Sequence, residues 1–226
     1  MQTPKNPELP KDTWQLLSKR LTPKRREKMV CVAQKRTNKV RLVLQDVHDP
    51  HNVAACLRSA EALGVLSVDI ITLSPPKSKS SAARGTSHWL NIRTFPSIRE
   101  CCAKLKDEGY IIAAGFPEAQ ADNSLFDMKV EGPIALVFGN EHSGIHADWL
   151  DAIDIKFTIP TVGMVESLNI SVSAAISMMQ VTRALRASLG EEAYYLSSGE
   201  QEALLGSWIY SRTRNAAKEL ELRRGK

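Results

Sequence analysis

Two kinds of apolar pattern alternate along the middle of the chain. Short apolar runs typical of buried strands occur at residues 40–47, 68–73, 90–95, 110–116, 134–138 and 155–159. Apolar residues at helical spacing occur at residues 52–63, 97–108, 146–153 and 168–189. Alternating strands and helices predict an α/β fold, with a mainly parallel sheet and helices on both faces. Residues 78–87 are expected to form a loop or a short helix.

Helical patterns also flank this middle region. Trp14, Leu17 and Leu21 would form the inner face of a short first helix, and Thr22-Pro23 is a typical start of a second one. Beyond Gly190, a polar stretch is expected to link the core to a helical tail with a basic end. We therefore expect a basic N-terminal extension at 1–39, a core domain at 40–189 and a C-terminal extension at 190–226.

Charge is distributed unevenly along the chain, whose net charge is +5. Residues 1–41 hold 12 Lys and Arg against 3 Asp and Glu, whereas residues 42–182 hold 10 against 16. A basic front end on an acidic core suggests a polyanionic partner such as RNA, although a solvated basic helix face would give the same pattern. The candidate phosphate contacts are Arg25, Arg26, Lys35 and Arg36.

Cysteines and apolar runs narrow the class of protein. None of the four cysteines forms a C-x-x-C pair, and Cys101 and Cys102 are adjacent, which suits neither a disulfide framework nor a zinc site. We therefore expect a reducing cytosolic environment and no metal. The polar, proline-broken start is unlike a signal peptide, and no apolar run approaches the ~20 residues of a membrane span.

The first of three stretches with candidate chemistry is residues 48–65. Asp49-Pro50 predicts a turn and Asn52 a helix cap. Arg58 would lie beside the buried stripe of that helix, less than two turns from its start, where a cation opposes the helix dipole. Its position favours a functional role, and an ion pair with Glu61 or Asp49 is the alternative.

The second stretch is residues 134–145, a strand that runs into Gly139 and a loop ending near Gly144. The loop is neither a G-x-G-x-x-G motif nor a P-loop. It is also not a G-x-S-x-G nucleophile elbow, so His142 and Ser143 do not indicate a hydrolase. What remains is a tight backbone beside one carboxylate, Glu141.

The third stretch is residues 157–179. A strand ends at Pro160, and a loop with Gly163 leads into a helix that Ser167 or Asn169 could cap. A strand end, a glycine-bearing loop and a helix N-terminus together present backbone groups to a ligand. An ordinary strand-to-helix connection is the alternative for this segment alone.

In this order, the three stretches resemble the motifs of the SpoU (TrmH) family of RNA ribose 2′-O-methyltransferases, in the SPOUT superfamily. The first motif has an asparagine followed six residues later by an arginine, here Asn52 and Arg58. Residues 138–144 match F-G-x-E-x-x-G, and residues 159–169 match I-P-x-x-G-x-x-x-S-L-N.

The similarity runs from about Thr22 to about Tyr210, with mild departures at Glu166 and Ile170. V-H-x-P-H-N at residues 47–52 and the basic N-terminal helix are most like the tRNA guanosine branch of the family.

The resemblance implies a C-terminal trefoil knot and a homodimer. It also implies that S-adenosylmethionine binds in the knot loops, largely through backbone atoms, against Gly115, Gly139, Ile159 and Leu168. General topology rules argue against knots, so that expectation rests on the family alone.

The implied reaction is methylation of a ribose 2′-hydroxyl, with a D-loop guanosine of tRNA as the expected substrate. Arg58 is the family's candidate for easing loss of the hydroxyl proton. An arginine is a poor base because its pKa is above ~12, so we favour binding a phosphate and stabilising the developing alkoxide, with direct proton abstraction as the alternative. Asn52, Glu141, Ser167 and Asn169 would hold Arg58, the ribose or the loops in place. A ribosomal RNA substrate and a non-catalytic RNA-binding role are the alternatives to this function.

Overall fold

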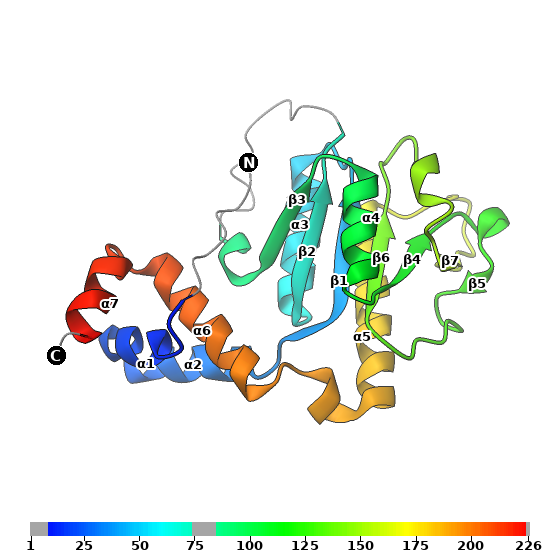
Figure 1. Ribbon diagram of the computed structural model, residues 1–226. Helices are drawn as coiled ribbons and strands as arrows, with labels where there is room; N and C mark the ends of the chain where they lie inside the picture. Colours follow the sequence, from blue (N-terminus) through cyan, green and yellow to red (C-terminus); the bar gives the residue numbers. More distant parts are fainter. Residues whose placement is uncertain (1–8, 74–84, 225–226) are drawn as a thin grey trace.

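A parallel sheet of seven strands forms the centre of the protein, in the order β3-β2-β1-β6-β4-β7-β5 (Figure 1). The computed structural model describes residues 9–73 and 85–224. The strands are β1 (Thr37–Gln45), β2 (Val65–Ile71), β3 (Asn91–Phe95), β4 (Ile111–Gly115), β5 (Asn123–Ser124), β6 (Ile134–Phe138) and β7 (Ile155–Thr158). Every paired strand runs parallel to its neighbour.

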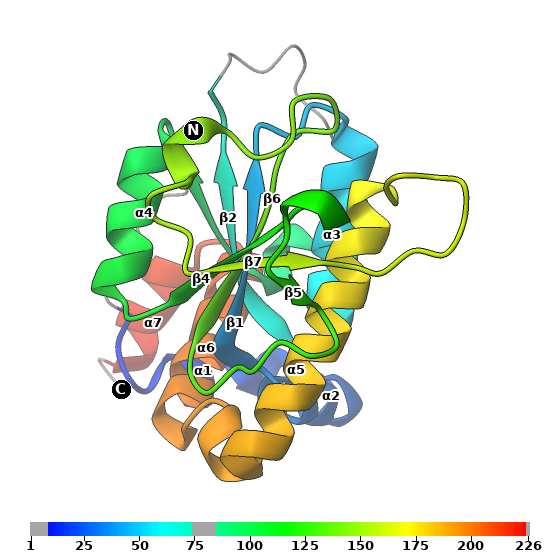
Figure 2. The same cartoon turned by 90° about the vertical axis from the view of Figure 1, so that its right-hand side faces the viewer.

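Helices cover both faces of this sheet (Figure 2). On one face lie α3 (Pro50–Ala62) and α5 (Ile170–Tyr194), whose apolar side chains share a core with β1 and β6. On the other lie α4 (Ile98–Asp107) and the 3₁₀ turn η4 (Ala147–Trp149), with Trp149 fully buried. Because the central strands are buried on both faces, they read as continuous apolar runs. The predicted α/β fold is confirmed.

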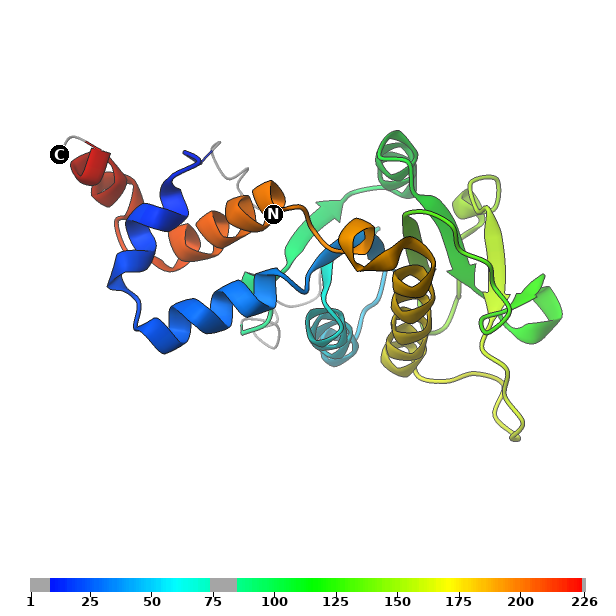
Figure 3. The ribbon, with the colours of Figure 1, turned by 90° about the horizontal axis from the view of Figure 1, so that it is seen from below.

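The two ends of the chain pack together beside the sheet (Figure 3). We call this group the helical unit: α1 (Thr13–Leu17), η1 (Ser18–Arg20), α2 (Pro23–Ala33), α6 (Ser198–Arg212) and α7 (Ala216–Arg224). Leu17 packs with Ile209 and Leu220, and Met29 packs with Trp208. No helix in residues 9–73 and 85–224 is both long and apolar enough to cross a membrane.

Two local expectations were wrong, and one expected helix is present with different bounds. The stretch after Gly190 is not a linker, because Ser197 and Glu200 form a capping box that begins α6. Residues 146–153 contain only one 3₁₀ turn, at Ala147–Trp149. The expected helix at 168–189 instead begins at Ile170 and continues to Tyr194, through a break at Gly190 where φ is 76°. The expected loop or short helix at 78–87 lies largely outside the described residues, and its last residue begins the 3₁₀ turn η2 (Ser87–Trp89).

The start of α3 also differs from expectation. Asp49 is the N-cap, and its side chain accepts a hydrogen bond of 2.8 Å from the backbone N–H of His51. Pro50 occupies the first turn, where its missing N–H costs nothing. Asn52 therefore lies inside the helix, and its side-chain amide is available for contacts elsewhere.

A buried charge network joins β1, β2, β3 and α4. The Asp69 side chain is fully buried and accepts hydrogen bonds from Arg41 at 2.9 Å and from Arg93 at 2.7 and 2.8 Å. Arg93 also donates to Glu108 at 2.7 Å. Burial alone would raise the pKa of Glu108, but its bonds and attraction to Arg93 and Arg41 lower the pKa instead. The pairing ties three neighbouring strands to the helix that covers them.

We expect Asp69→Asn to lower the free energy of unfolding by about 3 kcal/mol, because it leaves two largely buried guanidinium groups without their shared carboxylate. Urea unfolding of the purified protein measures this loss. Asp151→Asn removes the same charge from an exposed turn and should change stability by less than ~0.5 kcal/mol. Equal stability of the Asp69 and Asp151 variants would contradict a structural role for the network.

Candidate active site

Three neighbouring strands end at one edge of the sheet. There β6 ends at Phe138, β4 at Gly115 and β7 at Thr158, and two of them lead directly into the loops that the sequence singled out. The segment after β7 projects beyond the sheet and returns to the N-terminus of α5, beside α3 (Figure 2). Carboxyl ends of parallel strands are where α/β proteins bind ligands.

The loop after β6 closes tightly on itself. The backbone N–H of Asn140 donates to the carbonyl of Gly144 at 3.0 Å, and the N–H of Gly144 donates back to Asn140 at 2.9 Å. A Cβ on Gly139 would lie 2.1 Å from the Gly144 oxygen, and Gly144 itself has φ of 66°. Both glycines are therefore required by the geometry, and the turn holds Glu141 at the exposed edge.

One chain of hydrogen bonds joins the three sequence stretches. Asn52 in α3 donates through Nδ2 to Glu141 Oε1 at 2.9 Å, and its Oδ1 accepts from Asn169 Nδ2 at 3.1 Å. Asn169 caps α5, since its Oδ1 accepts the N–H of Ser171 at 2.8 Å. Of the two proposed caps of α5, Asn169 is thus the one used. The residues lie 89 and 117 positions apart in sequence, so only the fold brings them together.

Two predicted residues lie outside this chain of bonds. Arg58 is six residues further along α3 than Asn52, which is ~9 Å along the helix axis, and its side chain is exposed. Neither expected ion pair forms, because Glu61 binds Arg36 and Asp49 caps α3. Among the described residues, the Arg58 guanidinium makes no hydrogen bond or ion pair. Ser167 is exposed and its hydroxyl has no partner there either.

The predicted phosphate contacts differ in exposure. Arg25 and Lys35 are exposed, and Arg26 is exposed but donates to the Ser18 carbonyl at 3.0 Å. Arg36 is only 1% exposed, is bonded to Glu61 at 2.5 Å and lies against the Trp208 ring. The expectation that Arg36 presents its charge outward was wrong, because it lies beyond the end of α2 and is buried against α6.

Burial also determines the protonation state of Cys56, a thiol close to Glu141. Burial in α3 raises the pKa of Cys56 to about 12, and the negative charge of the nearby Glu141 carboxylate raises it further. The thiol therefore stays protonated at neutral pH, which disfavours a nucleophilic role. Within residues 9–73 and 85–224, no group of three or more His, Cys, Asp or Glu is arranged to hold a metal ion.

The loops offer free backbone groups next to apolar walls. The main chain of residues 160–168 makes no hydrogen bond to the described part of the protein. A Cβ on Gly115 would contact the rings of Phe138 and Phe157 at 3.4 and 3.6 Å, and Ile159 packs partly buried against the same core. An adenine-bearing ligand needs such flat apolar surfaces together with hydrogen-bond partners, so Gly115, Gly139, Ile159 and Leu168 fit one.

Two polar residues that secure this edge were missed from the sequence. Gln45, the last residue of β1, bonds to the backbone of Gly144 and His146. Asn140 donates to the carbonyl of Asp46 at 2.8 Å and accepts the N–H groups of His142 and Ser143. The sequence did offer a signal for each residue. Gln45 directly follows a run of buried apolar residues, and Asn140 directly follows a glycine, in a loop where asparagine side chains often bond to the nearby backbone.

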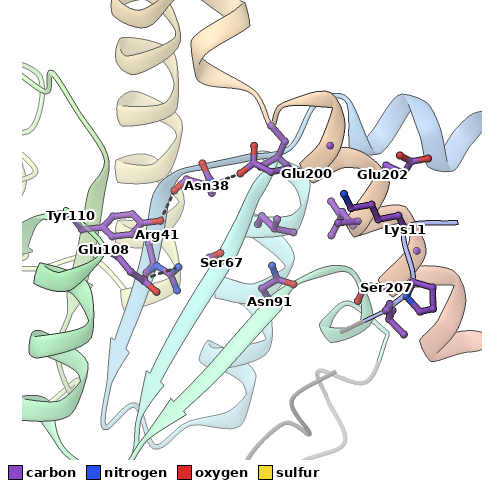
Figure 4. A pocket seen from close by; sticks show the side chains of 18 residues that line it. Lys11, Asn38, Arg41, Ser67, Asn91, Glu108, Tyr110, Glu200, Glu202 and Ser207 are labelled. Carbon is purple, nitrogen blue, oxygen red and sulfur yellow. Dashed lines mark hydrogen bonds and ion pairs between the residues drawn. The ribbon is translucent and has the colours of Figure 1, made fainter. Parts of the chain in front are cut away.

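A cavity of about 1010 Å³ lies at the opposite edge of the sheet (Figure 4). It opens between α6 and the amino ends of β1, β2 and β3, where Asn38, Ser67 and Asn91 face it. The candidate active site is instead an open set of loops, so cavity size alone would have pointed away from it.

A parallel sheet whose loops after β6 and β7 are both hydrogen-bonded to Asn52 of α3 is the architecture of a SPOUT-type methyltransferase. The model of the SpoU rRNA Methylase family matches residues 39–179. That match covers more than half of the 226 residues, and the chain belongs to this family. It is accordingly an RNA methyltransferase whose cofactor is S-adenosylmethionine.

Similar proteins act on two kinds of RNA. The tRNA (guanosine(18)-2′-O)-methyltransferase of Borreliella burgdorferi is 31% identical over 195 residues, 84% of this chain and 86% of that protein. The 23S rRNA (guanosine-2′-O-)-methyltransferase RlmB of Xylella fastidiosa is 36% identical over 150 residues, 63% of this chain and 57% of that protein.

Solved structures agree with this fold. The TrmH/SpoU tRNA modifying enzyme of A. aeolicus has a TM-score of 0.75 at 27% identity, over 85% of this chain and 98% of that one. The methyltransferase AviRb of Streptomyces viridochromogenes, solved with AdoMet, has a TM-score of 0.59 at 22% identity, over 67% of this chain and 61% of that one. At that identity AviRb supports the fold alone.

We expect Gly139→Ala to weaken binding of S-adenosylhomocysteine at least ~10-fold, because a Cβ there overlaps the Gly144 carbonyl and forces the loop open. Calorimetry in the presence of a chelator measures this affinity and also shows that binding needs no metal. Gly132→Ala is the matched control, since a Cβ at Gly132 meets nothing within 4 Å. Unchanged affinity of a folded Gly139→Ala protein would remove this loop from the cofactor site.

Proposed function

We propose that the protein transfers the methyl group of S-adenosylmethionine to the ribose 2′-hydroxyl of guanosine 18 in tRNA, the nucleoside named for its relative from Borreliella burgdorferi. The observation that carries the proposal is the hydrogen-bonded chain Glu141–Asn52–Asn169 beside loops with free backbone groups. The chain fixes polar side chains from three stretches beside the proposed cofactor loops.

The reaction sets two tasks for the protein. S-adenosylmethionine supplies a methyl group on a sulfonium, so the 2′-oxygen forms a bond to the methyl carbon while the carbon–sulfur bond breaks and its electrons return to sulfur. The protein must hold the hydroxyl in line with that bond and ease loss of its proton. Asn52 uses both ends of its amide to hold Glu141 and Asn169. The second carboxylate oxygen of Glu141 has no hydrogen-bond partner among the described residues, so it would accept a hydrogen bond from a ribose hydroxyl. Ser167, exposed in the loop that follows β7, would contact the ribose or the cofactor.

Arg58 would bind an RNA phosphate and stabilise the developing charge on the 2′-oxygen. It is the only Lys or Arg of α3, it is exposed, and its guanidinium is not committed to any described partner. An arginine keeps its proton at neutral pH, which favours this role over direct proton abstraction.

We also propose the trefoil knot and the homodimer. Support for the knot comes from the strand order, in which β6 lies between β1 and β4 although it follows both in sequence, and from α5, which returns from β7 to pack on α3. Support for the dimer comes from large apolar side chains that are exposed in a single chain: Val162, Met164, Val165, Val172 and Met179. A second copy would cover them.

The helical unit would hold the RNA. We propose residues 1–39 and 190–226 as extensions of a methyltransferase domain at 40–189, with Arg25 and Lys35 on exposed positions as phosphate contacts. Arg26 contributes charge from the same helix. The four free cysteines support a reducing, cytoplasmic setting.

A ribosomal RNA substrate is the second candidate, favoured by the 36% identity to RlmB over a shorter stretch. Incubation with S-adenosylmethionine and either tRNA or 23S rRNA transcripts, followed by mass spectrometry of nucleosides and fragments, separates the two. Methylation of rRNA alone would overturn the tRNA assignment, and methylation of neither would favour a non-catalytic RNA-binding protein.

We expect Arg58→Ala to slow methyl transfer by ~10²–10³, because one donor to the developing oxyanion is lost. Cofactor affinity should stay unchanged, and stability should change by less than ~1 kcal/mol, since the side chain is exposed and makes no described bond. Arg58→Lys should not restore the rate, because an ammonium cannot bind a phosphate and a ribose oxygen as a fork. Single-turnover methylation measures the rate, with Arg99→Ala, an exposed arginine of α4, as control. Normal turnover by Arg58→Ala would exclude the residue from the reaction.

We expect the pair of substitutions Arg25→Glu and Lys35→Glu to weaken tRNA binding and to flatten its dependence on salt by ~0.7–0.9 per lost phosphate contact. Filter binding over a range of salt concentrations measures both effects. Substitution is preferable to deletion of residues 1–36, because α1 and α2 pack against α6. Arg99→Glu with Lys106→Glu makes the same change of charge on α4. Equal affinities of the two double variants for tRNA at every salt concentration would show that the basic residues of the N-terminal extension are merely exposed to solvent and do not contact RNA.

A further inference from the structure

Gln45 is a buried polar residue that neither the sequence motifs nor the proposed mechanism uses. It is the last residue of β1 and is only 2% exposed. Its Nε2 donates to the carbonyl of Gly144 at 3.3 Å, and its Oε1 accepts the backbone N–H of His146 at 2.8 Å. Both polar ends of one side chain are therefore bound to the backbone of the same loop, residues 139–146.

These bonds are a large share of what holds the loop in place. Within the described residues, four side-chain hydrogen bonds join residues 139–146 to distant parts of the chain, and Gln45 makes two of them. The others are Asn140 to the Asp46 carbonyl and Asn52 to Glu141. The Gly144 carbonyl that Gln45 binds also closes the turn with Asn140. Gln45 thus binds the turn of residues 140–144 at the same carbonyl that closes it.

Because Gln45 is buried, its hydrogen bonds favour one particular position of the loop. A buried primary amide is costly unless its donor and acceptor are both bonded. Among the described residues the loop alone supplies partners for the Gln45 amide, so a movement of the loop away from β1 leaves that amide unsatisfied. The loop and the side chain therefore stabilise each other in one arrangement.

We propose that Gln45 is a positioning residue that sets cofactor affinity by holding the loop of Gly139 in its binding arrangement. The inference rests on the proposed cofactor site, in which S-adenosylmethionine lies against Gly139. Gln45 has no bond to Asn52, Arg58 or Asn169, and it acts through the loop backbone. Bound cofactor would hold the same loop, and with it Glu141, so the main effect of Gln45 is on how tightly the cofactor binds and not on the methyl-transfer step at saturating cofactor.

The test compares Gln45→Met, which keeps the length of the side chain but has no donor or good acceptor, with the wild type. We expect the Kd for S-adenosylhomocysteine to rise about tenfold, and the single-turnover rate at saturating S-adenosylmethionine to stay within about twofold. Gln45→Glu keeps the acceptor for the His146 N–H but sets a carboxylate oxygen against the Gly144 carbonyl, so its Kd should rise at least as far as that of Gln45→Met. Hydrogen exchange without cofactor should be faster over residues 140–146 in Gln45→Met.

Leu66→Val is the control for a general loss of stability. Leu66 lies on β2 and is only 4% exposed, but it packs with Met29 and Trp208 in a core that contains no described residue of the loop. Its substitution should leave both the Kd and the exchange of residues 140–146 unchanged. If Gln45→Met does not fold, Gln45→Glu, which has the same shape, replaces it in each measurement.

Two outcomes would overturn the role of Gln45. One is wild-type affinity and wild-type exchange in the Gln45 variants. The other is an equal effect of Leu66→Val, or a loss of rate at saturating cofactor as large as the loss of affinity. Failure of the proposed function is a separate result, since a wild-type protein that binds no S-adenosylhomocysteine would remove the cofactor site while the exchange experiment still decides whether Gln45 holds the loop.

Discussion

The side-chain amide of Asn52 is the contact on which the arrangement of the active site depends. An amide can donate and accept at once, and Asn52 does both, toward Glu141 in one loop and toward the cap of α5 in another. Without it, the carboxylate and the helix start would have no polar link to α3. The position is available because Asp49 and Pro50 begin α3 earlier, which moves Asn52 from the cap into the first turn.

The residues of the candidate site and the buried ion pairs that stabilise the sheet lie at different places along the strands. At the carboxyl edge the side chains of Glu141, Ser167 and Asn169 are exposed and lie next to a loop with free backbone groups. Toward the other edge, Asp69 is fully buried between two arginines, and Tyr110 donates to the Asn38 carbonyl at 2.5 Å. Buried ion pairs hold a single geometry because breaking one leaves an uncompensated charge. A rigid amino side supports a carboxyl side that must admit a cofactor and a strand of RNA.

In the helical unit, α2 has one face that packs against α6 and another face that exposes basic side chains. In α2, Met29 and Ala33 face α6, while Arg25 and Lys28 point to solvent. Arg36, just beyond the helix, is drawn into the interface by Glu61 and the ring of Trp208. A count of cations therefore overstates the charge that an RNA would meet, because a guanidinium can serve as a packing group between two helices.

The sequence alone determined the fold class and the three stretches of the site. Strands buried on both faces, such as β1 and β6, read as continuous apolar runs, and the motif residues at Asn52, Glu141 and Asn169 stand at fixed places after strand ends. Local patterns could not find β5, which is two residues long, or the capping box that turns an apparent linker into α6. They also could not decide which side chains meet: Arg58 points to solvent, Arg36 is buried, and Gln45 binds a loop almost a hundred residues later. Periodicity reports which face of an element is apolar, whereas the partner of a buried polar group is fixed only when distant segments pack and leave it one place to bond.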